Sequence, residues 1–310
     1  MDLRRLRLLL ELSRLGSMRE VADEMHVTTS TVSQQLAVLA KEAGATLIEP
    51  DGRRVRLTPA GRRLAEHAVS FLAAVDAARL DLDPDAAPAG TVRVAGFASA
   101  IRRALVPIAI ELAVHRPSVR LLIHEHEPAE AFALLAADAV DLALTYDYNL
   151  APAPFDHSLE PIPLWSTSWS LAIPATAEHT HNASDNANSS ARAVFARFRD
   201  EPWIVNSRNT ADEVAVRTIA SMSEFKAGSE FKAGFEPRIA HRVDSLELVQ
   251  DLIAAGLGVG LLPADDPVRP GVELVALADP EVTMRAYAVI RRGRAGWPPL
   301  ALVVGLLTGA

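Results

Sequence analysis

Residues 26–36 of this 310-residue chain, HVTTSTVSQQL, form a run of hydroxyl and amide side chains without lysine or arginine. A glutamine amide can pair with two groups on an adenine edge, and a threonine methyl can contact a thymine methyl. The run is therefore suited to contact DNA base edges. The alternative is that the hydroxyls only cap and solvate the first turn of a helix. The candidate base-contacting residues are Thr28, Thr29, Ser30, Thr31, Ser33, Gln34 and Gln35.

The flanking sequence predicts the helices that would present this run. Ser17, with Glu20 three residues later, is typical of a capping box at the start of a short helix. Thr28 is the N-cap candidate of a further helix that runs to about Ala43, and Gly44 ends it. Two helices joined by a tight turn form a helix-turn-helix, and the second helix then enters the major groove of DNA.

A predicted hairpin follows and gathers arginines. Asp51-Gly52 is a turn signal, and residues 54–58, RVRLT, alternate like a strand. Arginines on an isolated hairpin are usually only solvated, but after a helix-turn-helix they become candidates for phosphate or minor-groove contacts. We therefore expect a wing that contacts DNA through Arg53, Arg54 and Arg56, with Arg4 and Arg5 as further phosphate candidates.

A long helix is predicted after the hairpin, with Thr58 as its N-cap and Pro59 as its first residue. It has an apolar stripe that no neighbouring segment of the sequence covers, so a second copy of the chain is the simplest cover. Residues 83–90, DPDAAPAG, then form a linker rich in proline, alanine and glycine. The stripe consists of Leu64, Ala68, Phe71, Leu72, Val75 and Leu82.

Charge and composition limit the possible partners and compartments. Residues 1–66 carry 11 Lys and Arg against 9 Asp and Glu, whereas the whole chain has a net charge of −8. Only the first part is therefore suited to meet a polyanion. The absence of cysteine excludes a disulfide framework, a thiolate metal site and a cysteine nucleophile. No signal peptide or bilayer-spanning run is recognisable, so we expect a cytoplasmic protein without a membrane partner.

Beyond residue 90, strands and helices alternate, which predicts an α/β body with a largely parallel sheet. The strands are too many for one ordinary sheet, so we expect two lobes that share crossover strands. Residues 176–192 are polar and are predicted to form a loop. The perfect tandem repeat of SEFKAG at 223–234 is interpreted as a duplication that lengthens a loop or a helix.

Three segments at the start of the chain resemble the DNA-binding head of LysR-type transcriptional regulators. They are MDLRRLRLLLEL, GSMREVADEMHVTTSTVSQQLAVLAKEAGATLIEP and GRRVRLTPAGRRL. The segment DSLELVQDLIAAGLGVGLLP, residues 244–263, resembles a late motif of the same family. The resemblance thus covers nearly the whole chain.

The resemblance implies a fold and a function. The fold would be α/β, with a winged helix-turn-helix head, a long linker helix and a two-lobed effector-binding body that resembles periplasmic binding proteins. The function would be that of a homodimer or homotetramer that binds double-stranded promoter DNA and responds to a small molecule between the lobes. The implied domains are 1–58 for the head, 59–90 for the linker and dimerisation helix, and 91–310 for the body, with lobe I at about 91–163 and 267–310 and lobe II at about 164–266.

The head departs from the family pattern at several positions. Ser30 stands where the helix usually opens with proline, and Gln34 stands where a basic residue is usual. Ile48 and Pro50 replace a common phenylalanine and arginine. Two positive charges near the DNA phosphates are therefore missing, and we expect weaker non-specific affinity or a different half-site preference.

Polar residues at strand ends are the candidates for ligand binding, because ligands of open α/β sheets bind beyond the carboxyl ends of the strands. The resemblance implies that Ser99 and Thr145 line the effector cleft. Free backbone N–H groups at a helix start favour a small anion such as a carboxylate. Ser99 could equally be an ordinary helix cap. The candidates are Ser99, Ala100, Thr145, Asn206, Ser207 and Asp244.

The sequence offers little for catalysis or metal binding. It has no phosphate-binding glycine loop and no nucleophile elbow. His124 and His126 could share one face of a strand, but no third ligand stands nearby, so we expect no metal, no cofactor and no enzyme activity. Trp165 and Trp169 could stack on a ligand, although core packing is the commoner role for tryptophan. The alternative function is an α/β small-molecule-binding protein or an enzyme with a degenerate DNA-binding head, which should tolerate deletion of the head.

Overall fold

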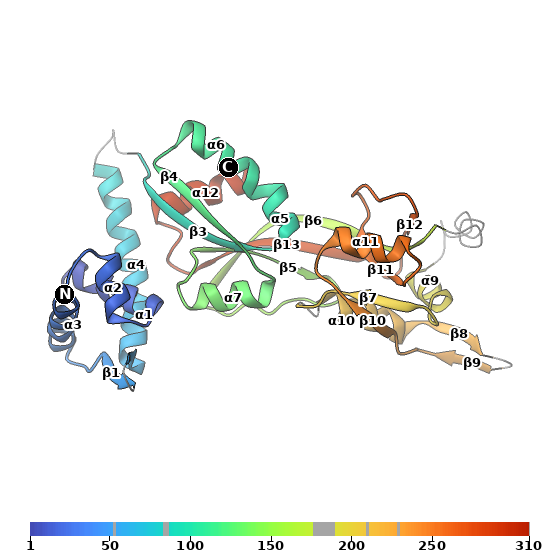
Figure 1. Cartoon of the computed structure of the whole chain (residues 1–310), viewed down its shortest axis with the longest axis horizontal. Helices are drawn as coiled ribbons and strands as arrows, with labels where there is room; N and C mark the ends of the chain where they lie inside the picture. Colours follow the sequence, from blue (N-terminus) through green and yellow to red (C-terminus); the bar gives the residue numbers. More distant parts are fainter. Residues whose placement is uncertain (52–53, 83–86, 176–189, 209–210, 228–229, 310) are drawn as a thin grey trace.

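The molecule is elongated, with a helical head at one end and a two-lobed body extending away from it (Figure 1). The long helix α4 (Pro59–Leu82) stands between the two parts (Figure 1). None of the helices in the described ranges has both the length and the apolar character that a membrane span requires. The structure is a computed structural model that describes residues 1–51, 54–82, 87–175, 190–208, 211–227 and 230–309.

The head contains the predicted helix-turn-helix. Helix α1 (Leu3–Leu15) ends at Gly16, and α2 (Met18–Glu24) begins after Ser17, whose side chain accepts the N–H of Glu20 at 3.4 Å. Helix α3 (Thr29–Ala43) ends at Gly44, which has the left-handed φ of 65° that favours glycine. These predicted helix starts and ends are confirmed. The three helices bury one shared core that includes Leu9, Val21, Val32, Leu36 and Leu39.

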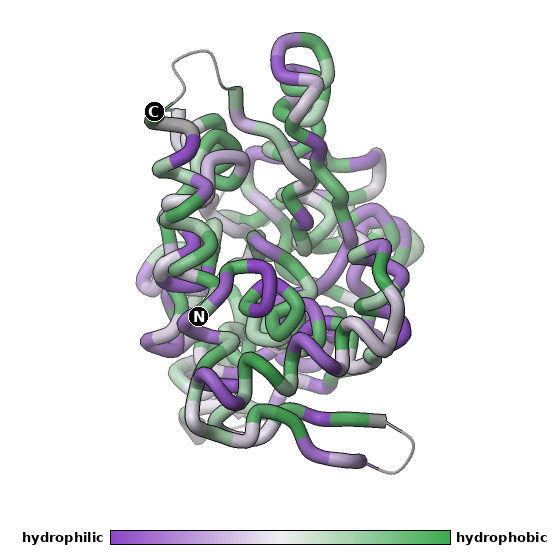
Figure 2. The backbone as a smooth tube through the Cα atoms, turned by 90° about the vertical axis from the view of Figure 1, so that its left-hand side faces the viewer, coloured by the Kyte–Doolittle hydropathy of each residue, from purple (hydrophilic) through white to green (hydrophobic). Residues whose placement is uncertain are grey.

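The predicted hairpin is also present. Strands β1 (Ile48–Asp51) and β2 (Arg54–Leu57) pair antiparallel, and the hairpin projects from the head (Figure 2). Thr58 caps α4 by accepting the N–H of Gly61 at 3.0 Å, and its hydroxyl donates to the carbonyl of Thr46 at 2.6 Å. Gly61 lies so close to the preceding loop that an added Cβ would be 2.1 Å from the carbonyl oxygen of Leu47.

The apolar stripe of α4 is partly covered within the chain, which corrects the expectation that nothing local covers it. Ala68 and Leu72 are buried, since α4 packs along α1 and also contacts α12 (Pro298–Thr308) of the body. Phe71 and Leu82 remain 49% and 84% exposed. The head and α4 therefore hold each other without a second copy of the chain, and only part of the stripe is left for a partner.

One continuous sheet runs through both lobes of the body, in the order β10-β7-β11-β6-β13-β5-β3-β4, with β12 also on β6. Neighbouring strands are parallel in the outer parts of the sheet, whereas β5, β13, β6 and β11 pair antiparallel in the middle. The expectation of a largely parallel sheet is wrong for this middle part. The strands are β3 (Gly90–Gly96), β4 (Val119–Glu125), β5 (Leu142–Tyr148), β6 (Leu159–Pro174), β7 (Pro202–Val205), β10 (Arg238–Arg242), β11 (Val259–Pro263), β12 (Val272–Val275) and β13 (Val282–Arg291).

The antiparallel pair β6 and β13 connects the two lobes. Strand β6 pairs with β13 from Leu159 to Trp169 and then with the lobe II strands β11 and β12 up to Pro174. The predicted two-lobed body with shared crossover strands is confirmed. Because β12 pairs with the lobe II end of β6, lobe II extends through Val275, and the predicted return to lobe I at residue 267 is too early.

Helices cover both faces of the sheet in each lobe (Figure 1). In lobe I, one unbroken helical stretch and α12 cover one face, and α7 (Pro128–Ala136) covers the other. The stretch consists of α5 (Ala98–Ala100), the π-helical turn η1 (Ile101–Leu105) and α6 (Val106–His115). In lobe II, α11 (Leu246–Ala254) packs on one face, and α9 (Ala191–Arg197) and α10 (Ala211–Met222) pack on the other.

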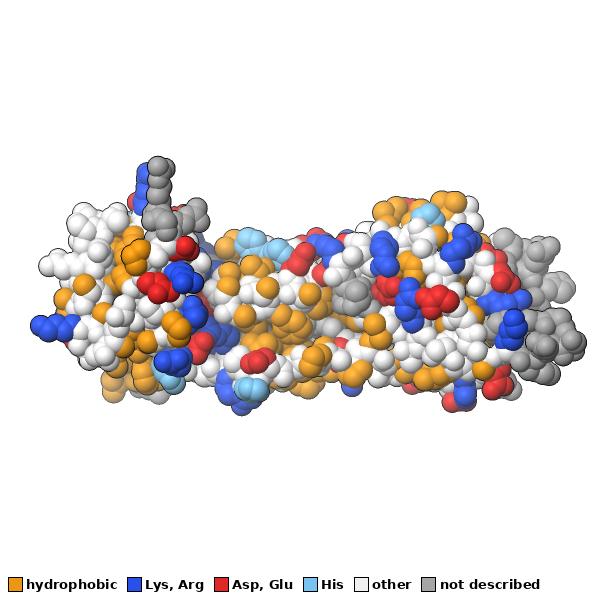
Figure 3. Space-filling model, turned by 90° about the horizontal axis from the view of Figure 1, so that it is seen from below, with side chains coloured by type: hydrophobic (Ala, Val, Ile, Leu, Met, Phe, Trp, Pro, Cys, Tyr) orange, Lys and Arg blue, Asp and Glu red, His pale blue; other side chains and the backbone are white. Residues whose placement is uncertain are grey.

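Two further predictions about the body differ from the structure. The tandem SEFKAG repeat forms neither a loop nor a helix but a hairpin of β8 (Glu224–Ala227) and β9 (Glu230–Ala233). The predicted polar loop lies outside the described residues up to 189, and its last residues belong to α9, which Ser190 caps. On the face seen from below, hydrophobic side chains gather over lobe I and charged ones of both signs over lobe II (Figure 3).

Candidate DNA-binding surface and ligand cavity

Helix α3 turns one polar face outward. Thr29, Ser30, Ser33 and Gln34 are exposed, while Val32 faces the head core. Ala37 and Lys41 continue the same exposed face toward the C-terminal end of the helix. A positive charge therefore lies only at the far end of this face, as the sequence departures indicated.

Three of the predicted base-contacting residues form hydrogen bonds within the head. Thr28 accepts the backbone N–H of Thr31 at 3.1 Å, and its hydroxyl is 2.8 Å from those of Ser30 and Thr31. Gln35 is half-buried, and its amide oxygen accepts the Nε of Arg5 at 2.9 Å. Helix capping therefore explains Thr28 and Thr31, and Gln35 helps to fix α1 against α3. The exposed face left for DNA consists of Thr29, Ser30, Ser33 and Gln34, and within it the Ser30 hydroxyl already lies 2.8 Å from that of Thr28.

The arginines predicted to contact DNA differ in whether they are already paired within the protein. Arg5 forms an ion pair with Glu42 in addition to its bond with Gln35, so it is less available to a phosphate. On the wing, Arg56 pairs with Glu49 at 2.9 Å across the two strands. Arg53 lies outside the described residues, and only the backbone of Arg54 is described, in β2.

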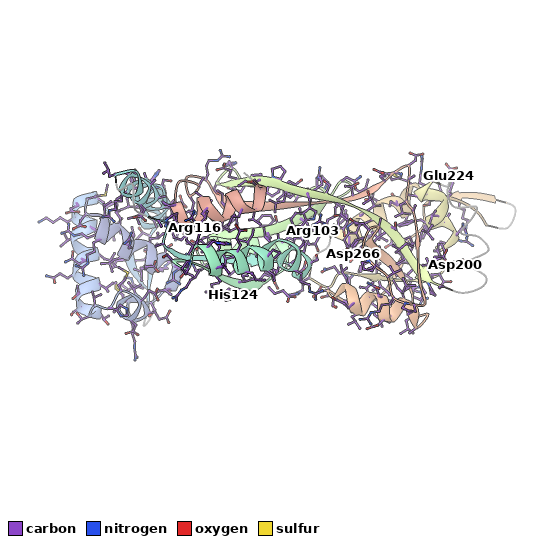
Figure 4. The ribbon with its side chains drawn as sticks, turned by 90° about the horizontal axis from the view of Figure 1, so that it is seen from above. Arg103, Arg116, His124, Asp200, Glu224 and Asp266 are labelled. Carbon is purple, nitrogen blue, oxygen red and sulfur yellow. The ribbon has the colours of Figure 1, made fainter. Side chains whose placement is uncertain are left out.

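A cavity of about 780 Å³ lies between the two lobes of the body. Lobe I lines it with residues from η1, β4 and β5, and lobe II lines it with residues at the starts of α10 and α11. Residues from β6 and β13 complete the wall, so the strands that connect the lobes also contact whatever fills the cavity. Figure 4 shows Arg103 of η1 and Asp266 of lobe II on opposite sides of the gap between the lobes.

Half of the predicted ligand-binding residues line this cavity, namely Ser99, Asn206 and Asp244. The other three do not. Ala100 is fully buried, and Ser207 donates to Asp244 from both its N–H and its hydroxyl, at 2.8 and 2.7 Å. Thr145 is 1% exposed and lies on the face of β5 opposite to Tyr146, because successive strand residues alternate between faces.

The cavity wall includes residues that sequence reasoning missed. Tyr146 and Tyr148 line it, and the alternation along β5 would have found them once Thr145 was placed on the other face. Glu127 and Asp212 line it as well, although each looks like a helix-start residue in the sequence. Both Trp165 and Trp169 also line the cavity, and both pack against the main body core.

Burial changes the acidity of the carboxyl groups in the wall. Glu127 is 6% exposed, and this burial raises its pKa, although the hydroxyl of Tyr146 donates to it at 2.9 Å. Burial also raises the pKa of Asp212 to about 6, even though Asp212 accepts the backbone N–H groups of Asn206 and Glu213 at 2.6 and 2.7 Å. Neither carboxylate forms a salt bridge with a residue in the described part of the chain.

Ion pairs connect the lobes at the rim of the cavity. Arg102 of lobe I pairs with Glu247 of lobe II, and this guanidinium lowers the pKa of Glu247 to about 2. Arg208 of lobe II lies 3.4 Å from Glu130 and 3.9 Å from Glu125, both of lobe I. The lobes are thus held together by charge at their rim, whereas Glu127 and Asp212 inside the cavity form no ion pair with a described residue.

His124 on β4 and His126 just after it are not joined by a third metal-ligating side chain in the described part of the chain. The rings of His124 and His126 stack with their centroids 6.4 Å apart, and Nδ1 of His126 lies 3.3 Å from Glu130. Among the residues that the structure describes, no group of three or more metal-ligating side chains is close enough together to hold an ion.

Comparison with known protein families shows which family the chain belongs to. Residues 3–62 match the bacterial regulatory helix-turn-helix proteins of the lysR family, and residues 85–310 match the LysR substrate binding domain. The chain belongs to the LysR family. It is therefore a ligand-responsive transcriptional regulator, with a DNA-binding head and an effector-binding domain.

Relatives along nearly the whole chain agree with the LysR assignment. The chain is 25% identical over 306 residues to a hydrogen peroxide-inducible genes activator from Dickeya chrysanthemi, covering 94% of this chain and 90% of that one. It is 28% identical over 270 residues to the transcriptional dual regulator GltC from Bacillus subtilis, covering 82% and 81%.

Solved structures of LysR regulators share the fold. A full-length OxyR variant from Pseudomonas aeruginosa aligns with a TM-score of 0.71 at 20% identity, over 100% of this chain and 94% of that chain. ArgP from Mycobacterium tuberculosis aligns with a TM-score of 0.65 at 20% identity, over 100% and 97%.

Proposed function

We propose that this LysR regulator contacts promoter DNA through the exposed face of α3 and the wing. A small molecule bound in the inter-lobe cavity would change the orientation of the two lobes relative to each other. The observation that carries the proposal is the cavity itself, whose wall comes from both lobes and from the two strands that connect them. A ligand that contacts both lobes favours one lobe arrangement through its differential affinity.

The DNA contacts would divide between specificity and positioning. Ser33 and Gln34 are the exposed residues of α3 with side chains suited to base edges. Arg53 and Arg54 on the wing would contact phosphates or the minor groove, since phosphate contacts position a protein without reading sequence. A regulator of this kind acts where the chromosome is, so we place it in the cytoplasm, and we assign it no catalytic step.

Self-association would use exposed apolar residues of the body. Val106, Ile110 and Val114 lie four residues apart on α6 and are 44%, 63% and 68% exposed. Leu122 on the neighbouring edge strand β4 is 48% exposed. Such a stripe on a helix beside a free strand edge is typical of a surface that a second chain covers. We propose it as a homodimer contact, which an Ile110→Glu variant should weaken in analytical ultracentrifugation.

A peroxide response, which the names of several relatives suggest, is disfavoured by the chain itself. Proteins commonly sense peroxide through oxidation of a cysteine thiolate. This chain contains no cysteine. A reversibly bound ligand in the cavity is therefore the better candidate for the signal.

Nuclease footprinting on the DNA that flanks the protein's own gene tests the DNA-binding part, with a salt titration beside it. We expect a protected inverted repeat, because a two-fold dimer presents two heads. Protection should weaken steeply with salt and be lost in the Arg53→Ala, Arg54→Ala double variant. Arg238→Ala is the control, since Arg238 is exposed on β10 in lobe II, far from the head. Weak protection without sequence preference, unchanged by the double variant, would contradict the proposal.

A further inference from the structure

Aromatic rings line the inter-lobe cavity in unusual number. Two of the three tyrosines and two of the four tryptophans of the chain line it, together with Phe97. Four of these rings, all but that of Trp165, form a continuous series of edge-to-face contacts. The ring centroids of Phe97 and Tyr146 are 4.7 Å apart, those of Tyr146 and Tyr148 6.1 Å, and those of Tyr148 and Trp169 5.3 Å. This edge-to-face packing covers much of each ring with its neighbour, so the four side chains are at most 9% exposed.

Carboxylates outnumber arginines in the same wall. The arginines Arg102, Arg103 and Arg269 line it, and two of them are already paired, Arg102 with Glu247 and Arg269 with Asp251. Arg103 lies 4.8 Å from the centre of the Trp165 ring. The lining carboxylates are Glu125, Glu127, Asp212, Asp244, Glu247 and Asp266.

Two of the lining carboxylates, the buried Glu127 and the half-buried Asp212, form no ion pair with a described side chain, although Arg208 and Arg242 act on their charges from a greater distance. Within that part of the chain, Glu127 accepts a hydrogen bond from Tyr146, and Asp212 accepts backbone N–H groups. By contrast, Asp244 is paired with Arg208 at 2.7 Å. Placing acids in such a site is costly unless an opposite charge compensates them, and their raised pKa values reflect that cost.

We infer that the cavity binds an organic cation, a small protonated or quaternary amine, with its charge beside Glu127 and Asp212 and its apolar part against the aromatic rings. Aromatic faces attract cations through the ring quadrupole, and carboxylates supply the opposite charge. This inference rests on the proposed function and names the class of its ligand. It replaces the small carboxylate expected from the sequence, because six carboxylates and only three arginines are among the described lining residues, and two of these arginines are already paired with carboxylates.

Three molecules of one shape and different charge test the inference, namely benzylammonium, benzyl alcohol and benzoate. Each is titrated into the full-length protein while calorimetry and the intrinsic tryptophan fluorescence, to which Trp165 and Trp169 of the cavity wall contribute, report binding. We expect benzylammonium to bind about tenfold more tightly than benzyl alcohol, and benzoate to bind most weakly. Tetramethylammonium should compete with benzylammonium.

Variants then assign the preference to Glu127 and Asp212. In the Glu127→Gln, Asp212→Asn double variant, benzylammonium should lose its advantage over benzyl alcohol. Glu111→Gln makes the same charge change on the exposed side of α6, outside the cavity, and should keep the advantage. Near-UV circular dichroism and the DNA footprint check that each variant is folded.

Two results would overturn the inference. One is benzoate binding as tightly as benzylammonium, and the other is no binding of either ammonium ion by the folded wild-type protein. In both cases the DNA footprint of the same preparation still decides the proposed regulatory function. A failed ligand class and a failed regulator are thus distinguishable.

Discussion

The two functional surfaces of this LysR regulator are built in opposite ways. The DNA-binding face of α3 comes from one stretch of sequence, is exposed, and carries hydroxyls and amides. The inter-lobe cavity gathers residues from Phe97 to Met284, buries much of their surface, and carries aromatic rings and carboxylates. A surface that meets a large, hydrated polyanion can remain open. A small ligand must be enclosed before a few contacts can hold it.

The two surfaces also differ in which polar and charged groups they leave without a partner. In the head, Thr28, Thr31 and Gln35 satisfy one another or their neighbours, and the remaining polar groups face water. In the cavity, Glu127 is buried and Asp212 is half-buried, and neither forms an ion pair with a described side chain, although Arg208 and Arg242 act on their charges from a greater distance. The head thus tolerates the absence of DNA at little cost, whereas the cavity is costly when empty, and this cost is the energy that a ligand can use.

The largest expected effect comes from a variant that should disrupt the head while leaving the cavity of the body intact. Gly61→Ala would place a Cβ 2.1 Å from the backbone oxygen of Leu47, so the wing and α4 would have to move apart. We expect the head to lose on the order of 2–3 kcal/mol of stability and the DNA footprint to disappear. Thermal unfolding followed by circular dichroism measures the change, and benzylammonium binding by the body should persist.

The control for this variant is Gly296→Ala. An added Cβ at Gly296 would meet nothing within 4 Å, and the variant should behave like the wild type. Equal stability of the Gly61 and Gly296 variants would show that the wing does not depend on this close approach.

The second prediction tests which residues of α3 read sequence. Gln34→Ala should lower discrimination at one base pair by about 1–3 kcal/mol while leaving non-specific binding nearly unchanged. Gln35→Ala is the matched comparison, since Gln35 bonds to Arg5 and should affect head stability and not base preference. Competition binding against a set of single-base variants of the site measures both. The same shift in preference for both variants would rule out the assigned division of roles.

The head could be predicted from sequence because its signals are local. Ser17, Thr28 and Thr58 each cap a helix whose start lies within a few residues, and Gly44 ends one. The cavity could be predicted only in part, because Glu127 and Asp212 become neighbours of one space only after the lobes fold together. Ser99, Asn206 and Asp244 were found because strand ends of an α/β body converge, which is a property of topology.

Two elements of the body were missed, one because a local signal was not used and the other because its sequence contains no local signal. The SEFKAG repeat contains Gly228-Ser229 between two identical segments, and a glycine-serine pair between strand-forming segments is a hairpin signal that went unused. Helix α12 was not predicted, because its sequence PPLALVVGLLT is apolar on all sides and shows no helical period. It packs between the body and α4, so tertiary contacts and not periodicity fix it.

The third prediction concerns the cost of the acids inside the cavity. The pKa of Asp212 is about 6 in the folded protein, above its ordinary 3.8, so the folded state retains a proton that the unfolded state releases. Stability is therefore lost as pH rises from about 4 to 6. Asp212→Asn removes this pH-dependent loss. The free energy of unfolding of the variant, measured relative to that of the wild type, should therefore rise by on the order of 1–3 kcal/mol between pH 4 and pH 7.

Chemical unfolding at several pH values measures this difference. Other titrating groups near Asp212, namely Glu127, Glu213 and Tyr148, are present in both proteins and largely cancel in the comparison. A difference between variant and wild type that stays constant with pH would show that Asp212 is solvated like a surface carboxylate. The cavity would then resemble the α3 face, and the contrast between the two surfaces would weaken.

The smallest expected effect concerns the ion pair that closes the cavity rim. Arg102 and Glu247 are both exposed, at 69% and 44% of their side chains, so water screens the pair and its contribution is small. Because the pKa of Glu247 falls to about 2 in the folded protein, this contribution is complete above pH 4.5 and is lost as pH falls toward 2. Arg102→Met and Glu247→Gln should each lower the melting temperature of the body slightly at pH 7.

A double-mutant cycle decides whether the two charges act together. If they stabilise the closed lobes as a pair, the double variant should melt at nearly the same temperature as either single variant, and high salt should remove the difference from the wild type. Arg116→Met is the control, since Arg116 is exposed after α6 and away from the rim (Figure 4). Additive losses would mean that each residue acts alone. The lobes would then be held by β6 and β13 without a charged closure, and a ligand in the cavity would have to supply the closing contacts itself.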